Sequence, residues 1–108
     1  MSNIQQAIKQ AQLFQQKIAD LQKKLEGETV LGVAGGGLMK ITCTGKGKVL
    51  KVDIDPSLID PNDKEMLEDL VVAAFNDANK KADERSREEM EKISSSSGIP
   101  MDLLNSAF

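Results

Sequence analysis

The apolar pattern of residues 64–93 restricts the fold of this chain more than any other feature. Its first half repeats apolar side chains at intervals of three and four residues: Leu67, Leu70, Val71, Ala74, Phe75, Ala78 and Ala82. This spacing places them on one face of an α-helix. Beyond Asn79 most side chains are charged, and opposite charges four residues apart, such as Lys80 and Glu84, support a helix without burial. The pattern predicts one long helix with a buried first half and a projecting, charged arm.

A second helix is predicted over about residues 2–26, with Gly27 at its C-terminal end. Its heptad positions a and d are apolar throughout: Ile4, Ala7, Ala11, Phe14, Ile18, Leu21 and Leu25. This seam would be about 30 Å long, which is more than one small sheet would cover. Two arrangements remain open. The whole seam could lie on the chain's own core, or part of it could pack on the other long helix or on a partner chain; we favour the second.

Three short extended segments separate the two helices. Residues 29–33 are rich in β-branched side chains, and residues 38–44 and 48–55 alternate apolar with polar ones. Glycines between these segments supply the two reversals. The side chains predicted to face inward are Met39, Ile41 and Cys43 in the second segment and Leu50, Val52 and Ile54 in the third. The predicted fold class is therefore α+β, with the order α-β-β-β-α and two long helices flanking a three-stranded antiparallel sheet.

Residues 1–93 are predicted to form this domain, and residues 94–108 a separate C-terminal extension. The extension begins with four serines and Gly98, a composition typical of a flexible linker. The residues that follow are too apolar to be merely solvating, so we expect a tail that contacts other parts of the protein.

The composition excludes most catalytic chemistry. The chain has no histidine and one cysteine, Cys43, so it lacks the commonest general base, the commonest zinc ligand and any intrachain disulfide. Asp53 and Asp55 could hold a divalent ion, but their position at the end of a strand explains them better. We therefore expect no enzyme activity, no cofactor, no metal and no small-molecule substrate. No apolar run approaches 18 residues, which predicts a cytoplasmic protein without a membrane partner.

Charge is distributed unevenly along the chain. The formal net charge is −3, but residues 1–52 hold eight lysines and three acids, whereas residues 53–108 hold six basic and fourteen acidic residues. An acidic total argues against indiscriminate binding of polyanions. A local basic surface built from the N-terminal half could still bind one.

Four stretches together carry a family resemblance. They are the Gln- and Lys-rich first helix, the turn at residues 35–38, the sequence VDIDPSL at 52–58 and, above all, LEDLVVAAFNDA at 67–78. Over about residues 3–93 the chain resembles the YbaB/EbfC family of small bacterial nucleoid-associated DNA-binding proteins. The resemblance implies a homodimer whose paired helices project like tweezers. It also implies binding of double-stranded DNA in the nucleoid, with effects on DNA conformation, nucleoid organisation and gene expression.

Our own prediction of the DNA-binding residues rests on cations that can reach phosphates, since phosphate neutralisation supplies most non-specific affinity. We favour basic residues of the two long helices: Lys9, Lys17, Lys23, Lys24, Lys80, Lys81, Arg85 and Arg87. The sheet lysines, Lys40, Lys46, Lys48 and Lys51, rank second. The residues predicted to form the core or the dimer interface are Phe14, Ile18, Leu67, Leu70, Val71, Ala74, Phe75 and Ala78.

An alternative function is a protein-interaction clamp. In that case the helical seam or the apolar tail would engage another protein without direct DNA binding, and the lysines would serve only solubility.

Overall fold

The computed structural model describes residues 2–107 and has the element order expected from the sequence. The elements are α1 (Ser2–Glu26), β1 (Thr29–Ala34), β2 (Met39–Thr44), β3 (Val49–Ile54), α2 (Lys64–Ser97) and a short α3 (Met101–Ser106), with single 3₁₀ turns at Gly35–Gly37 and Pro56–Leu58. The strands form one antiparallel sheet in the order β1-β2-β3. The predicted α+β class and the α-β-β-β-α order are confirmed.

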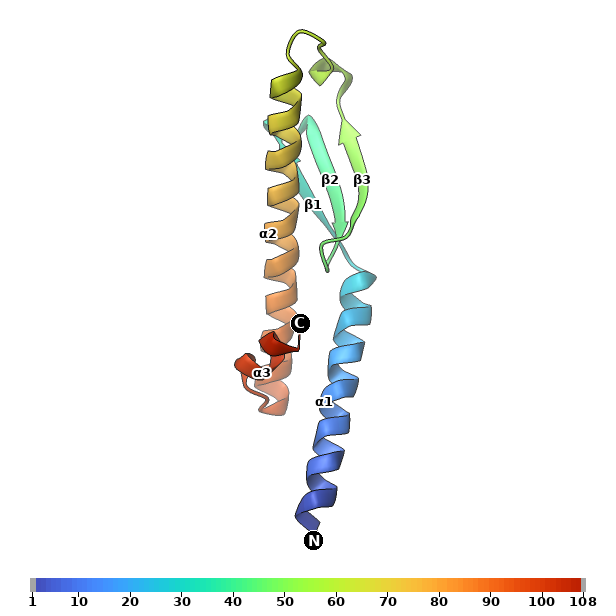
Figure 1. Cartoon of the computed structure of the whole chain (residues 1–108), viewed down its shortest axis with the longest axis vertical. Helices are drawn as coiled ribbons and strands as arrows, with labels where there is room; N and C mark the ends of the chain where they lie inside the picture. Colours follow the sequence, from blue (N-terminus) through green and yellow to red (C-terminus); the bar gives the residue numbers. More distant parts are fainter. Residues whose placement is uncertain (1, 108) are drawn as a thin grey trace.

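The molecule is elongated, with extents of 73 × 19 × 18 Å. Figure 1 shows the sheet against the first half of α2 and α1 running antiparallel to the second half. Helix α2 begins at Asp63, whose side chain accepts a hydrogen bond from the N–H of Met66, and it ends at Gly98 in the left-handed conformation. The N-terminal end of α1 projects beyond the end of α2 (Figure 1).

Helix α2 approaches the sheet closely at Gly32 of β1. A Cβ atom at this position would lie 2.2 Å from the carbonyl oxygen of Ala74 and 2.6 Å from the Cβ of Ala78. Small residues on both elements therefore let the two backbones meet. The core around this contact consists of Met39, Ile41, Cys43, Leu58, Ala74 and Ala78. Cys43 is fully buried, as the alternation predicted, and burial raises the pKa of its thiol.

Two side chains of α2 cover the outer edge of β1. Asp77 Oδ2 accepts a hydrogen bond from the N–H of Val33 at 2.9 Å, and Lys81 Nζ donates to the carbonyl oxygen of Leu31 at 2.8 Å. Asp77 and Lys81 also pair with each other at 3.0 Å. The hydrogen bond from Val33, followed by that from Lys81, lowers the pKa of Asp77. Because these groups occupy the edge, β1 cannot readily pair with another strand.

Strand β3 is exposed along its whole length. The expectation that helices would cover Leu50, Val52 and Ile54 was therefore wrong. The inward direction predicted for Val52 and Ile54 is correct, because Val52 pairs with Ile41 and Ile54 with Met39 on the helix side of the sheet. However, α2 lies over β1 and β2, and the register shift opposite Thr42/Cys43 leaves Leu50 without a direct partner.

A second apolar cluster joins α1, α2 and the C-terminal segment. Its buried members are Leu21, Leu25, Met90 and Leu104, and the half-buried residues packed on them are Phe14, Ile18, Ile93, Ile99 and Met101. The apolar tail therefore contacts both long helices. The serines expected to form a linker instead belong to the last turns of α2, where the hydroxyl groups of Ser96 and Ser97 donate to the carbonyl oxygen of Ile93.

We expect Gly32→Ala to destabilise the fold by about 3 kcal/mol, because the added methyl group meets backbone atoms of α2 that cannot move independently. Urea unfolding at one fixed protein concentration measures the change. Gly27→Ala is the matched control, since a Cβ there would meet its nearest atom at 3.6 Å, and it should change stability by less than about 0.5 kcal/mol. Equal midpoints for both variants would contradict the close approach.

Candidate nucleic-acid interface

Helix α1 is the element with an excess of cations. It carries four lysines against two acids, whereas α2 carries six basic residues against nine acids. Three of the four lysines, Lys9, Lys17 and Lys23, have no carboxylate within ion-pair distance among residues 2–107. At 100° per residue, Lys9 and Lys23 lie opposite the apolar seam, and Lys17 lies on its flank. Lys9 and Lys23 are exposed and Lys17 is half-buried.

The fourth lysine belongs to an ion cluster where α1 meets α2. The side chain of Glu89 is 7% exposed and accepts ion pairs from Lys24 at 2.9 Å, Arg85 at 2.6 Å and Lys92 at 3.1 Å. Arg85 also contacts Glu28 through two nitrogens, with Nε 2.8 Å from Oε2 and Nη2 2.9 Å from Oε1. This cluster ties the C-terminal end of α1 to the middle of α2.

The cluster keeps Glu89 ionised. The hydrogen bond from Lys24 is the largest influence, and together with Lys92 and Arg85 it outweighs burial and lowers the pKa of Glu89 to about 2. The pKa of Arg85 is raised, first by Glu28 and then by Glu89. Both charges therefore persist over the physiological pH range.

The eight basic residues predicted to bind DNA fall into three groups. Lys24, Lys81 and Arg85 are held in ion pairs within the chain. Lys80 and Arg87 carry no ion pair in the described part of the chain, but Asp83, Glu84 and Glu91 are close to them on α2. The remaining group is Lys9, Lys17 and Lys23 on α1. The structure thus brings Lys24 and Arg85 together around Glu89, whereas Lys9 lies in the N-terminal third of α1.

The eight predicted core or interface residues divide between the two apolar clusters and the surface. Ala74 and Ala78 are buried beneath the sheet, with Leu67 and Leu70 packed against them. Phe14 and Ile18 are half-buried in the cluster that includes the tail. Val71 and Phe75 are 36% and 38% exposed, respectively, on α2. Participation of these residues in a dimer interface remains a prediction.

Sequence reasoning missed the buried role of Glu89. Its four-residue spacing from Arg85 is a usable signal for one of the ion pairs. The partners Lys24 and Glu28 are more than 50 residues distant in sequence, and only the packing of α1 against α2 brings them in. The complete ion cluster could therefore be identified only from the three-dimensional structure.

Comparisons with known proteins agree with the fold. Residues 1–97 match the model of the YbaB/EbfC DNA-binding family. A nucleoid-associated protein of Gluconacetobacter diazotrophicus is 46% identical over 103 residues, covering 95% of this chain and 96% of the relative. One from Clostridium acetobutylicum is 41% identical, covering 91% and 88%. The crystal structure of an uncharacterized Helicobacter pylori protein has the same fold, with a TM-score of 0.73 at 23% identity over 82% of this chain and 92% of that one.

These matches define a class of small bacterial nucleoid-associated proteins. The chain belongs to the YbaB/EbfC DNA-binding family. The family takes its name from DNA binding and is not an enzyme family. Within residues 2–107 no three metal-ligating side chains gather, and none of the described helices has the length and apolar character needed to cross a bilayer.

We expect Glu89→Gln to reduce the free energy of unfolding by about 1–3 kcal/mol at neutral pH, because Lys24, Arg85 and Lys92 lose a shared anion. The folded-state pKa of Glu89 lies below the ordinary glutamate value of about 4.3. Its contribution is therefore complete above that value and is lost as pH falls toward about 2. Urea unfolding at a series of pH values should show the difference between the two proteins narrowing below about pH 4.3.

Glu88→Gln is the control for this measurement, since Glu88 is 64% exposed and contacts Arg85 at 3.5 Å. It should have little effect at any pH. A Glu89→Gln difference that persists unchanged down to pH 2 would argue against a shared, ionised Glu89.

Proposed function

We propose that this protein binds duplex DNA as a homodimer in the bacterial nucleoid, mainly through phosphates, and thereby alters DNA conformation and gene expression. The observation that carries the proposal is the set of α1 lysines, Lys9, Lys17 and Lys23, which have no acidic partner in the described chain. Family membership makes DNA the expected polyanion. A lysine without an internal partner is available to displace counterions from a phosphate.

Helix α1 is favoured over the other basic surfaces for electrostatic reasons. Moving Lys24 or Arg85 onto a phosphate would break ion pairs with the nearly buried Glu89. Lys80 and Arg87 would bring Asp83, Glu84 and Glu91 toward the DNA. On α1, Asp20 lies three residues from both Lys17 and Lys23, but no acid lies within four residues of Lys9. The sheet lysines remain the second choice; Lys51 already contacts Asp53 at 3.4 Å.

The proposed dimer contact is the open side of the sheet. Val52 and Ile54 of β3 are 45% and 38% exposed on the helix side. Val71 and Phe75 lie on the side of α2 away from Asp77 and Lys81, which contact the β1 edge. We infer that these exposed apolar side chains supply the surface that the dimer buries. Because the β1 edge is covered and the β3 edge is not, a second copy would approach from β3.

A dimer would also double the number of α1 lysines facing one DNA molecule. Since each chain carries a formal net charge of −3, attraction must come from this local surface and not from the whole protein. Binding should therefore be strongest at low salt and should weaken steeply as salt is added.

We expect the triple substitution of Lys9, Lys17 and Lys23 by Gln to weaken duplex binding by roughly tenfold or more at low salt. The slope of log affinity against log salt should become shallower by about 0.9 for each phosphate that the variant no longer neutralises. Fluorescence anisotropy with a labelled duplex at several salt concentrations measures both quantities. Lys64→Gln, at the start of α2, is the control for removal of a single exposed lysine and should bind like the parent protein.

The outcomes of this titration have different meanings. If the triple variant binds DNA as tightly as the parent protein, the sheet lysines, and not the α1 lysines, would be the expected DNA-binding residues. Absence of binding by the parent dimer at low salt would overturn the DNA proposal and favour the protein-interaction clamp.

We expect Val52→Lys to convert the dimer into single chains at micromolar concentration, because two lysines would face the apolar contact without partners. Multi-angle light scattering measures the mass. Val72→Lys is the matched control, since Val72 is 58% exposed on a part of α2 that faces away from the sheet, and it should leave the dimer intact. If Val52→Lys stays dimeric, the contact lies elsewhere.

A further inference from the structure

The first half of α1 carries an apolar seam that nothing in the described chain covers. Phe14, Ile18, Leu21 and Leu25 pack into the second apolar cluster, but Ile4, Ala7 and Ala11 continue the same heptad positions beyond it and are exposed. Ile4 is 68% exposed and Ile8, beside the seam, 52%. The heptad spacing of apolar residues is the same in the exposed and the buried parts of the seam. We therefore expect the exposed part, like the buried part, to pack against another helix.

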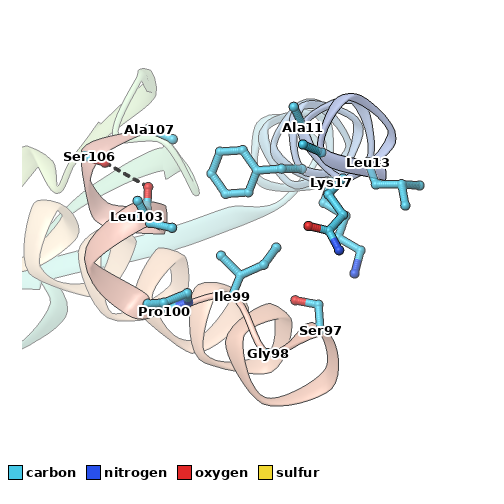
Figure 2. A pocket seen from close by; sticks show the side chains of 13 residues that line it. Ala11, Leu13, Lys17, Ser97, Gly98, Ile99, Pro100, Leu103, Ser106 and Ala107 are labelled. Atoms are coloured by element: carbon cyan, nitrogen blue, oxygen red, sulfur yellow. Dashed lines mark hydrogen bonds between the residues drawn. The ribbon is translucent and has the colours of Figure 1, made fainter. Parts of the chain in front are cut away.

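The tail adds a second wall beside this seam. A groove of about 730 Å³ runs between α1 and the C-terminal segment, and its apolar lining comes from Ala7, Ala11, Phe14, Ile99, Pro100 and Leu103. Figure 2 shows Ile99, Pro100 and Leu103 of the tail across the groove from α1, with Leu13 pointing away from them. The seam and the groove beside it together form a surface on which one end of another helix can pack.

We propose that this seam, residues 4–14, pairs antiparallel with the same segment of a second copy and so joins two dimers end to end. Antiparallel heptads place each a position opposite a d position of the partner helix. In one register Ala7 lies opposite Ala11 of the second copy, and Ile4 lies opposite Phe14. Small side chains meet at the centre and allow a close approach, while each Ile4 end enters the groove beside Phe14 of the other copy.

The charge pattern favours a second copy as the occupant. Between residues 3 and 16 the sole charged residue is Lys9, which lies opposite the seam at heptad position f. The flanking e and g positions over this stretch are Asn3, Ile8, Gln10 and Gln15, so no like charges oppose each other when the segment meets itself. One cation in fourteen residues is a poor surface for phosphates, which favours protein over DNA along the seam.

This contact leaves most of the proposed DNA-binding surface free. It uses the seam, whereas Lys9 and Lys23 lie on the opposite side of α1 and stay accessible; Lys17 lines the groove and is the one proposed DNA-binding lysine beside the contact. It is also separate from the β3 surface, so a dimer built on β3 would present two free seams, one from each chain. Pairing through these seams would link DNA-bound dimers to one another.

The first test is the mass of the purified full-length protein across a range of concentrations, without DNA. Sedimentation equilibrium should show mass rising above that of two chains at high concentration. Ala11→Glu should weaken the association of two dimers by roughly a hundredfold. The symmetric contact would bury two unpaired carboxylates, and each should lower the association constant at least about tenfold. Gln12→Glu adds the same charge at the next residue, outside the seam, and should behave like the parent protein.

Variants of the two surfaces separate this proposal from the dimer proposal. Val52→Lys should still pair through α1 at high concentration, and the double variant with Ala11→Glu should remain a single chain. Helix content by circular dichroism checks that the exposed Ala11 site tolerates the change. Parent protein that never exceeds two chains, or Ala11→Glu that associates like the parent, would overturn the seam contact whatever the DNA titration gives.

Disulfide trapping tests the register and the identity of the occupant. Ala7→Cys protein mixed with Ala11→Cys protein should form a covalent two-chain product under mild oxidation, because the proposed layer brings these two positions within disulfide range. A mixture of Ala7→Cys with Gln12→Cys should form several-fold less. The natural Cys43 is buried and stays in both partners. Equal yields from the two mixtures would overturn the proposed register.

Discussion

The contact between α2 and the sheet at Gly32 determines which surfaces of this protein remain open. Gly32 and the two alanines opposite it bring the backbone of α2 directly onto β1. A helix about 10 Å wide that is drawn to one side of a three-stranded sheet covers two strands and leaves the third. The apolar side chains of β3, including Val52 and Ile54, are consequently exposed although they point to the helix side. Close packing at one edge thus leaves an uncovered apolar surface at the other.

The same arrangement explains how the cations are divided. Helix α2 extends past the sheet, and α1 returns along its second half, which brings Lys24 and Glu28 against Arg85 and Glu89. A nearly buried glutamate at such a junction needs cations around it, because an ionised carboxylate without partners is costly to bury. Lys24, Arg85 and Lys92, which contact Glu89, therefore stabilise the fold. Lys9, Lys17 and Lys23 of α1 have no such contact within the described chain.

Much of this architecture follows from sequence periodicity. The three-and-four spacing of residues 67–82 and the alternation of Met39, Ile41 and Cys43 locate the long helix and the central strand correctly, because both patterns reflect burial on one face. Periodicity failed at β3, since alternation identifies which side a residue faces but not whether another element covers it. It also failed at Ser94–Ser97, where hydroxyl groups bond back to the helix and composition alone indicates a linker.

The heptad seam of α1 shows what an apolar sequence pattern can predict and what it cannot. Leu21 and Leu25 pack with α2 and the tail of their own chain, whereas Ile4 and Ala7 occupy the same heptad positions and are exposed. The physical requirement is identical in both halves, because apolar side chains at a and d are stable when another helix shields them from water. The heptad pattern predicts that a second helix packs on the seam, but it does not specify whether that helix belongs to the same chain. Helix α2 ends before the N-terminal end of α1 is reached (Figure 1), so within the described chain the first half of the seam stays exposed, and the proposed second copy would supply the missing helix.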